Sequence, residues 1–135
     1  MYGAAAALFK RLLESKEDPV YYSHLGLALY KQSSFEEAKS AYQKAVELDP
    51  ERAARFVSLA QVYKSLGLFE HSIVALNKAI EIDQENLDFL LFLSSLQIEL
   101  KNYKDAREVL ERILELSPKN LDAKKMLKEI EDFED

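Results

Sequence analysis

The chain contains no cysteine among its 135 residues, which excludes disulfides, thiolate nucleophiles and cysteine-ligated metal sites. Glycine and proline are also scarce, with three of each. Sandwiches and barrels need many turns, which these two residues commonly form, so an all-β fold is nearly excluded. A hydrophobic share of 48% and a charged share of 31% are typical of a folded domain rather than a disordered chain.

Positive charge is in the minority. Lysine and arginine total 18 against 24 aspartates and glutamates, for a net charge of −6. Nucleic acid and anionic membrane surfaces both require a cationic face, so neither is expected as a partner. No apolar run approaches the roughly 20 residues that span a bilayer, and the N-terminal apolar stretch lacks the preceding basic residues of a secretory signal. These absences predict a cytoplasmic protein without membrane insertion.

Catalytic and cofactor-binding motifs are absent from the sequence as well. The two histidines, His24 and His71, lie far apart, and neither belongs to the HxxxH or HExxH spacing of a metal site. Three scattered glycines cannot build a phosphate-binding loop. We therefore expect no enzyme, no bound metal and no cofactor.

The main positive feature is a repeat at a fixed offset of 34 residues. Leucine, aromatic and small residues each recur at this offset, as Leu25, Leu59 and Leu93, as Phe35, Phe69 and Tyr103, and as Ala38, Ser72 and Ala106. Within each unit the apolar residues are spaced by three and four, as on one face of a helix. Each unit breaks near its middle, at Ser33-Ser34, Gly67 and Lys101-Asn102. Each unit is therefore predicted to be a helical hairpin.

Local signals place the ends of the helices. Asp18-Pro19 combines a capping residue with a first-turn proline. Ser34 with Glu37 fits a capping box, and Asn102 can cap in the same way. We predict eight helices, near residues 4–16, 19–32, 35–48, 53–66, 69–82, 87–100, 103–116 and 121–133.

The repeated motif resembles the tetratricopeptide repeat, a helix–turn–helix family with this period. The resemblance is carried in the first helices by Tyr22, Leu25-Gly26 and Leu29, by Phe56, Leu59-Ala60 and Tyr63, and by Leu90 and Leu93-Ser94. In the second helix of the first unit it is carried by Ala38, Tyr42, Ala45 and Pro50. The pattern is broken at Gln84, Gln97 and Ile113. The resemblance implies an all-α fold, a right-handed α-solenoid forming one domain over 1–135. A half repeat at 4–16 precedes repeats at 19–52, 53–86 and 87–120, and a capping helix at 121–133 follows them.

Gly26 lies inside a predicted helix, where glycine costs about 0.5–1 kcal/mol relative to alanine. Ala60 and Ser94 occupy the same column of the other repeats. Small residues let neighbouring helices approach closely, so we expect a packing reason for this glycine.

The first predicted helix aligns with the second helices of the repeats, which places Leu8 and Leu12 in core columns. The last helix aligns with the first helices and places Leu127 in a core column. The first helix also carries a second apolar row, where the repeats are polar, made of Ala5, Phe9 and Leu13. This row predicts an additional neighbour. Either the chain is a fragment lacking its preceding hairpin or two copies pair through this row, with local refolding as a lesser alternative.

In the family, first helices line a concave groove where peptides or helices dock. Half of the corresponding stripe here is valine, leucine, isoleucine or tyrosine, although a solvated face should be polar. We predict a partner-binding groove made of Val20, Ser23, Leu27, Tyr30, Val57, Gln61, Lys64, Leu91, Ser95 and Ile98. The alternative is that second helices or the terminal helix shade this face.

The sequence therefore predicts a non-catalytic adaptor, scaffold or assembly module that binds a partly apolar peptide or helix. A homo-oligomerisation module that self-associates through the N-terminal helix is the alternative, and an accessory domain of a longer enzyme comes third. Some family members bind the acidic tails of heat-shock chaperones through a lysine and asparagine clamp. Ser23 and Leu27 occupy the clamp positions here, which disfavours that specificity. If the groove is not the site, the outer surface around Ile73 and Val74 is the next candidate.

Overall fold

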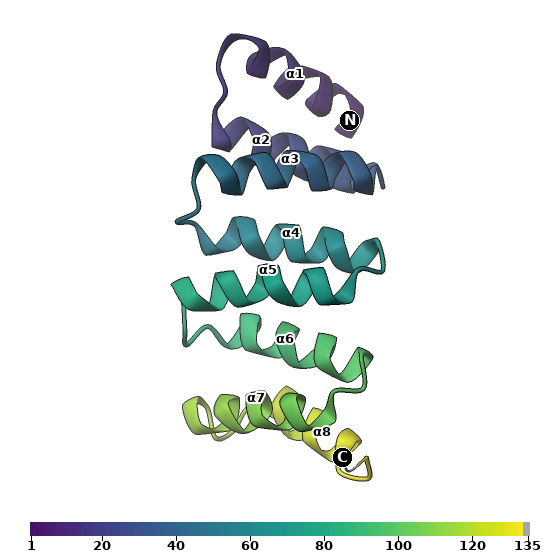
Figure 1. Cartoon of the computed structure of the whole chain (residues 1–135), viewed down its shortest axis with the longest axis vertical. Coiled ribbons are helices and arrows are strands. Elements are labelled where there is room, and N and C mark those ends of the chain that lie inside the picture. Colours follow the sequence, from purple (N-terminus) through teal and green to yellow (C-terminus); the bar gives the residue numbers. More distant parts are fainter. Residues whose placement is uncertain (134–135) are drawn as a thin grey trace. The chain divides into compact units, whose positions relative to one another are not determined.

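The structure, a computed structural model, describes residues 1–133, and every element in them is a helix (Figure 1). Eight helices follow one another in these residues, namely α1 (Tyr2–Ser15), α2 (Pro19–Lys31), α3 (Phe35–Leu48), α4 (Ala53–Ser65), α5 (Phe69–Ile82), α6 (Leu87–Glu99), α7 (Tyr103–Leu116) and α8 (Leu121–Ile130). The predicted all-α fold of eight helices is confirmed. The prediction was wrong at the end of the last helix, which stops at Ile130 rather than at residue 133. Glu134 and Asp135 lie outside the described residues.

Two compact units can be distinguished, residues 1–82 and residues 83–135. In the first unit each of the helices α1 to α4 contacts the next helix, and α2 also contacts α4. In the second unit α7 contacts both α6 and α8, and α6 also contacts α8. A single domain over the whole chain remains a prediction.

The turn inside each repeat has the same backbone conformation. Ser33, Gly67 and Lys101 occupy one column and have φ values of 63°, 76° and 62°, in the left-handed region. The residue after each of them donates its backbone N–H five residues back, as in the bond from Ser34 to Leu29 O at 2.9 Å. This bond is typical of a Schellman helix end. The prediction that Gly67 ends a helix in this conformation is confirmed.

Only one of the three predicted side-chain caps is present. Asp18 caps α2 as predicted, with its Oδ1 accepting from Val20 N at 2.8 Å. The capping predicted at Ser34 and Asn102 was wrong, because neither side chain makes a capping hydrogen bond. Each of these two residues already closes the preceding helix with its own N–H. Its backbone, near φ −85° and ψ 67°, is also not the extended conformation that caps usually adopt.

Close packing explains why a glycine occupies position 26, as the sequence predicts. A Cβ atom built on Gly26 would lie 2.8 Å from Cε2 of Tyr42 in α3. Tyr42 is buried, and Leu76 and Leu110 are buried in the same column of the other repeats. The ring of Tyr42 therefore rests directly on the backbone of α2.

The prediction for Leu8 was wrong, because its side chain is 53% exposed although it occupies the Tyr42 column. In α3 this column is covered by the preceding helix α2, whereas no described helix precedes α1. Leu12 is half-buried, and so is Leu127 in α8. The core of the second unit includes Leu93, Leu110 and Ile130.

Candidate functional site

One face of the first unit combines exposed apolar side chains from α2 and α4. Val20 and Leu27 of α2 are 44% and 47% exposed. Val57 of α4 is half-buried, and Gln61 and Lys64 are exposed. Because α2 and α4 are in contact, we call this surface the α2–α4 face. It contains all seven groove residues that the sequence predicts within the first unit.

Side-chain hydrogen bonds tie the two helices of this face together. The hydroxyl of Ser65 in α4 donates to Tyr30 Oη at 3.4 Å. The ring of Tyr30 also lies 5.4 Å from the ring of Phe35. Tyr30 is half-buried, so it forms part of the framework of the face as well as of its surface.

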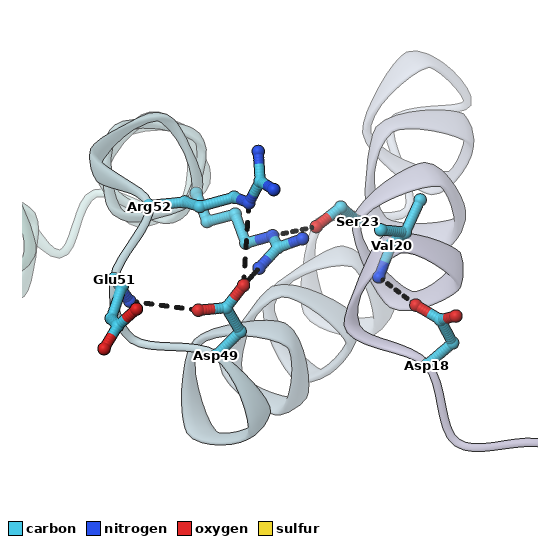
Figure 2. A network of polar contacts seen from close by, with 7 residues as sticks. Asp18, Val20, Ser23, Asp49, Glu51 and Arg52 are labelled. Atoms are coloured by element: carbon cyan, nitrogen blue, oxygen red, sulfur yellow. Dashed lines mark hydrogen bonds and ion pairs between the residues drawn. The ribbon is translucent and has the colours of Figure 1, made fainter.

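A buried arginine lies beneath one end of the α2–α4 face. Arg55 in α4 is buried. Its Nε donates to Ser23 Oγ at 3.0 Å, and its Nη1 donates to Asp49 Oδ2 at 2.7 Å. Asp49, which follows α3, also accepts through Oδ1 from the backbone N–H of Glu51 at 3.2 Å (Figure 2). Ser23, predicted as a groove residue, therefore has an intramolecular partner.

The charge of Asp49 is stabilised by its surroundings. The hydrogen bond from Arg55 lowers the pKa of the Asp49 carboxyl most, and the backbone N–H of Glu51 lowers it further. Arg52 adds a longer ion pair, with its Nε 3.6 Å from Asp49 Oδ2. The network joins α2, α4 and the turn after α3, and so fixes the spacing of adjacent repeats.

The sequence did not single out Arg55. Its column holds Tyr21, Phe89 and Ala123 in the other units, so the repeat pattern gives no reason to expect a buried arginine there. The only available signal was the pairing of an acidic residue, Asp49, with an arginine six positions later. That signal is common on protein surfaces and does not distinguish a buried pair from an exposed one.

The groove residues predicted in the second unit lie together on α6. Leu91, Ser95 and Ile98 are half-buried. Leu91 and Ser95 border a cleft of about 270 Å³ that α8 lines with residues including Met126. The hydroxyl of Ser95 donates to the carbonyl of Phe92 at 2.7 Å. In this unit the predicted stripe is thus flanked by the terminal helix.

The apolar row predicted for self-association contacts α2 of the same chain. Ala5, Phe9 and Leu13 are all half-buried. The ring of Phe9 stacks on His24 with a centroid distance of 5.0 Å and lies 6.3 Å from Tyr21. The row therefore packs on α2, the next helix of the chain. An additional neighbour for this row, including a second copy of the chain, remains a prediction.

Both histidines make contacts with aromatic rings. His24 stacks on Phe9, and His71 lies 5.4 Å from the ring of Tyr63. Within residues 1–133, no three histidine, aspartate or glutamate side chains are grouped as metal ligands would be. None of the helices in this part of the chain is long and apolar enough to cross a membrane.

Family models of the tetratricopeptide repeat match three stretches of the sequence, residues 19–52, 53–86 and 72–130. The first two matches coincide with the predicted boundaries of repeats 1 and 2. All three models describe this repeat, and none describes a catalytic domain.

Individual proteins agree with this assignment. The TPR repeat-containing protein YvcD of Bacillus subtilis (strain 168) is 31% identical over 60 residues, which are 44% of this chain but only 12% of YvcD. The structure of the Arabidopsis OM64 TPR domain superposes with a TM-score of 0.74 at 26% identity, covering 86% of this chain and 96% of that domain.

A further solved structure is the first TPR domain of Spaghetti (RPAP3) bound to the HSP90 peptide SRMEEVD. It has a TM-score of 0.75 at 24% identity and covers 84% of this chain and 90% of that one. At this identity the likeness concerns the fold alone. The repeat period, the paired helices and the three matching stretches together show that the chain belongs to the tetratricopeptide repeat family of protein-interaction modules.

Proposed function

We propose that the α2–α4 face binds a partly apolar segment of another protein, and that the chain acts as a non-catalytic adaptor or scaffold. The observation that carries this proposal is the exposure of Val20 and Leu27 on one face of α2. Val57 adds a half-buried apolar side chain on α4, which contacts α2. A face with only a structural role would be polar toward solvent, and contiguous exposed apolar surface is typical of interaction sites.

The chemistry of the face favours an apolar ligand over an acidic tail. Leu27 and Ser23 occupy the positions that would carry a basic clamp, and Ser23 Oγ already accepts from Arg55. The charge of Arg55 is in turn neutralised by Asp49 at 2.7 Å. Burying one leucine or valine contributes about 1.5–3 kcal/mol, whereas an exposed ion pair contributes about 0–1 kcal/mol. Apolar burial is therefore expected to dominate the affinity.

Selection of peptides from a displayed random-peptide library on the full chain tests this proposal. Selected peptides would be synthesised and titrated against the wild type and the double variant Val20→Glu/Leu27→Glu. We expect the double variant to bind at least about tenfold more weakly, because two apolar contacts are lost. Binding to the wild type should change little between low and moderate salt, since the ion-pair contribution is small.

Ile82→Glu is the matched control, because Ile82 is an exposed apolar residue on α5 outside the face. It should bind the selected peptides like the wild type. Leu91→Glu reports separately on the stripe of the second unit. The proposal is wrong if the double variant stays folded by circular dichroism and binds as tightly as the wild type. If the double variant unfolds, the two residues belong to the core instead.

A further inference from the structure

A second apolar cleft lies elsewhere in the first unit, between α4 and α5. Its cavity volume is about 360 Å³, and its floor is formed by Phe56, Leu59, Tyr63 and Ala75. At 100° per residue, its three α4 residues point roughly 130° away from Val57, Gln61 and Lys64. The cleft is therefore separate from the α2–α4 face.

The first repeat provides a direct comparison, because the cleft at the same position has a charged and polar rim. That cleft measures about 260 Å³, and Ser40 and Glu37 stand on its rim. Lys10 from α1 reaches across and pairs with Glu37 at 3.4 Å. An ion pair and a hydroxyl thus replace apolar surface at the mouth of this cleft.

In repeat 2 both of these polar residues are replaced. His71 stands where repeat 1 has Glu37, and Val74 stands where it has Ser40. Val74 is 63% exposed, and the ring of His71 packs near Tyr63 at 5.4 Å. Repeat 3 has acidic residues, Asp105 and Glu108, at the two positions. Repeat 2 is therefore the only repeat with an uncharged apolar residue on this rim.

The two ends of the cleft carry opposite charges. Glu70 and Lys78 line it, and eight residues of helix separate them by about 12 Å. Among the described residues, neither forms an ion pair. By contrast, Arg112, in the Lys78 column of repeat 3, pairs with Glu115 at 3.5 Å. Both charges of the repeat 2 cleft are thus available to a ligand.

We propose that this cleft is a second docking site, for a short protein segment with one or two large apolar side chains between a basic and an acidic residue. The apolar side chains fill the space over Phe56 and Tyr63 beside Val74. The basic residue lies opposite Glu70, and the acidic residue lies opposite Lys78. About four extended residues span the 12 Å between these charges. The volume is at the lower end of that of small-molecule pockets, and matches side chains in size.

A blocked tetrapeptide, Arg-Leu-Phe-Glu, serves as the probe. Its binding to the full ¹⁵N-labelled chain can be followed by amide chemical shifts, with Arg-Ala-Ala-Glu and Arg-Leu-Phe-Arg as comparison peptides. We expect chemical shift changes of α4 and α5 amides around the cleft. Either comparison peptide should bind at least about fivefold more weakly, because the first lacks the large apolar side chains and the second lacks the acidic residue.

Three variants test the residues of the rim. Val74→Ser restores the residue of repeat 1 and should weaken the probe by at least about fivefold. Lys78→Glu should weaken the probe and strengthen binding of Arg-Leu-Phe-Arg, because the end charge is reversed. Ile82→Ser, which also removes an exposed apolar residue of α5, is the matched control and should leave both affinities unchanged.

The proposal is overturned if the probe shifts no cleft amide, or if Lys78→Glu does not change the preference between the two peptides. It is also overturned if indole saturates the cleft while the probe does not bind, since the site would then be one for small molecules. Val20→Glu/Leu27→Glu should bind the probe like the wild type. Failure of this site is therefore distinguishable from failure of the α2–α4 face.

Discussion

Replacing Gly26 by alanine tests the closest helix contact of the first unit. The new Cβ atom would lie 2.8 Å from Cε2 of Tyr42 and 2.9 Å from its Cδ2 and Cζ atoms. These separations are well below the usual contact distance between carbon atoms. Tyr42 is buried, so its ring cannot move aside without displacing its neighbours. The substitution must therefore move the ring or separate α2 from α3.

Two opposing contributions determine how much Gly26→Ala changes the free energy of unfolding. Alanine in place of glycine stabilises a helix by about 0.5–1 kcal/mol. Inserting a carbon into a packed core typically costs about 1–3 kcal/mol. We expect the packing cost to exceed the gain in helix propensity, so Gly26→Ala should lower the free energy of unfolding by about 1–2 kcal/mol. Urea titration followed by circular dichroism measures this difference, and Gly26→Leu should lower the stability further.

The other repeats suggest how to isolate the contact. Ala60 faces the Leu76 column in repeat 2, and repeat 3 combines a serine with a leucine. The smallest residue thus accompanies the largest partner. In a Tyr42→Leu background, Gly26→Ala should be neutral or stabilising, giving a coupling energy of at least about 1 kcal/mol in the double-mutant cycle. Ala60→Gly should cost about 0.5–1 kcal/mol.

Two results would contradict a close contact between Gly26 and Tyr42. If Gly26→Ala stabilises the wild type by the helix-propensity gain alone, the ring of Tyr42 does not rest on this backbone. If Gly26→Ala destabilises both backgrounds equally, the cost arises from a contact other than Tyr42.

Three further predictions concern the turns and the network. Ser33→Gly and Lys101→Gly should each raise the free energy of unfolding by about 0.5–1 kcal/mol in urea titrations, because side chains are strained at positive φ. Asp49→Asn should reduce the loss of stability on acidification, taken as the difference in the free energy of unfolding between about pH 7 and pH 3. The pKa of Asp49 is lowered, chiefly by Arg55, so its stabilisation is present above the unfolded-state pKa and is lost as pH falls through the folded-state pKa. Asp18→Ala should lower the thermal midpoint, because removing a helix cap costs about 0.5–2 kcal/mol.

The repeat period was sufficient to predict the helices, because each column is sampled three times. Errors arose where a local rule competed with the geometry of the turn. Ser34 fits a capping box by sequence, but the turn is so short that its N–H closes the preceding helix. Leu8 shows the second kind of error. Its column is buried only where a preceding helix covers it, and a residue pattern does not supply that helix.

The site was predictable to a different extent. The exposure of Val20 and Leu27 follows from helix periodicity, since both lie away from the packing stripe. The partners of Ser23 do not follow from it. Arg55 joins Ser23 and Asp49 across a repeat boundary, and both Ser23 and Arg55 depart from their own columns, where Val57 and Phe89 stand in other repeats. Such a network depends on three-dimensional proximity and not on the period.

In a repeat protein each residue can be compared with the residues of the same column in the other repeats. This comparison distinguishes departures with a structural cause from departures with a functional one. Gly26 departs from its column, but the ring of Tyr42 occupies the space that it leaves. Arg55 also departs, and the carboxylate of Asp49 compensates its charge. At Val74 an exposed apolar side chain replaces polar residues, and burial within the fold does not account for it. A departure that lowers solubility without a packing gain is what a contact with another molecule requires. Val74, like exposed Leu27 in the column of Gln61 and Ser95, therefore differs in kind from Gly26 and Arg55.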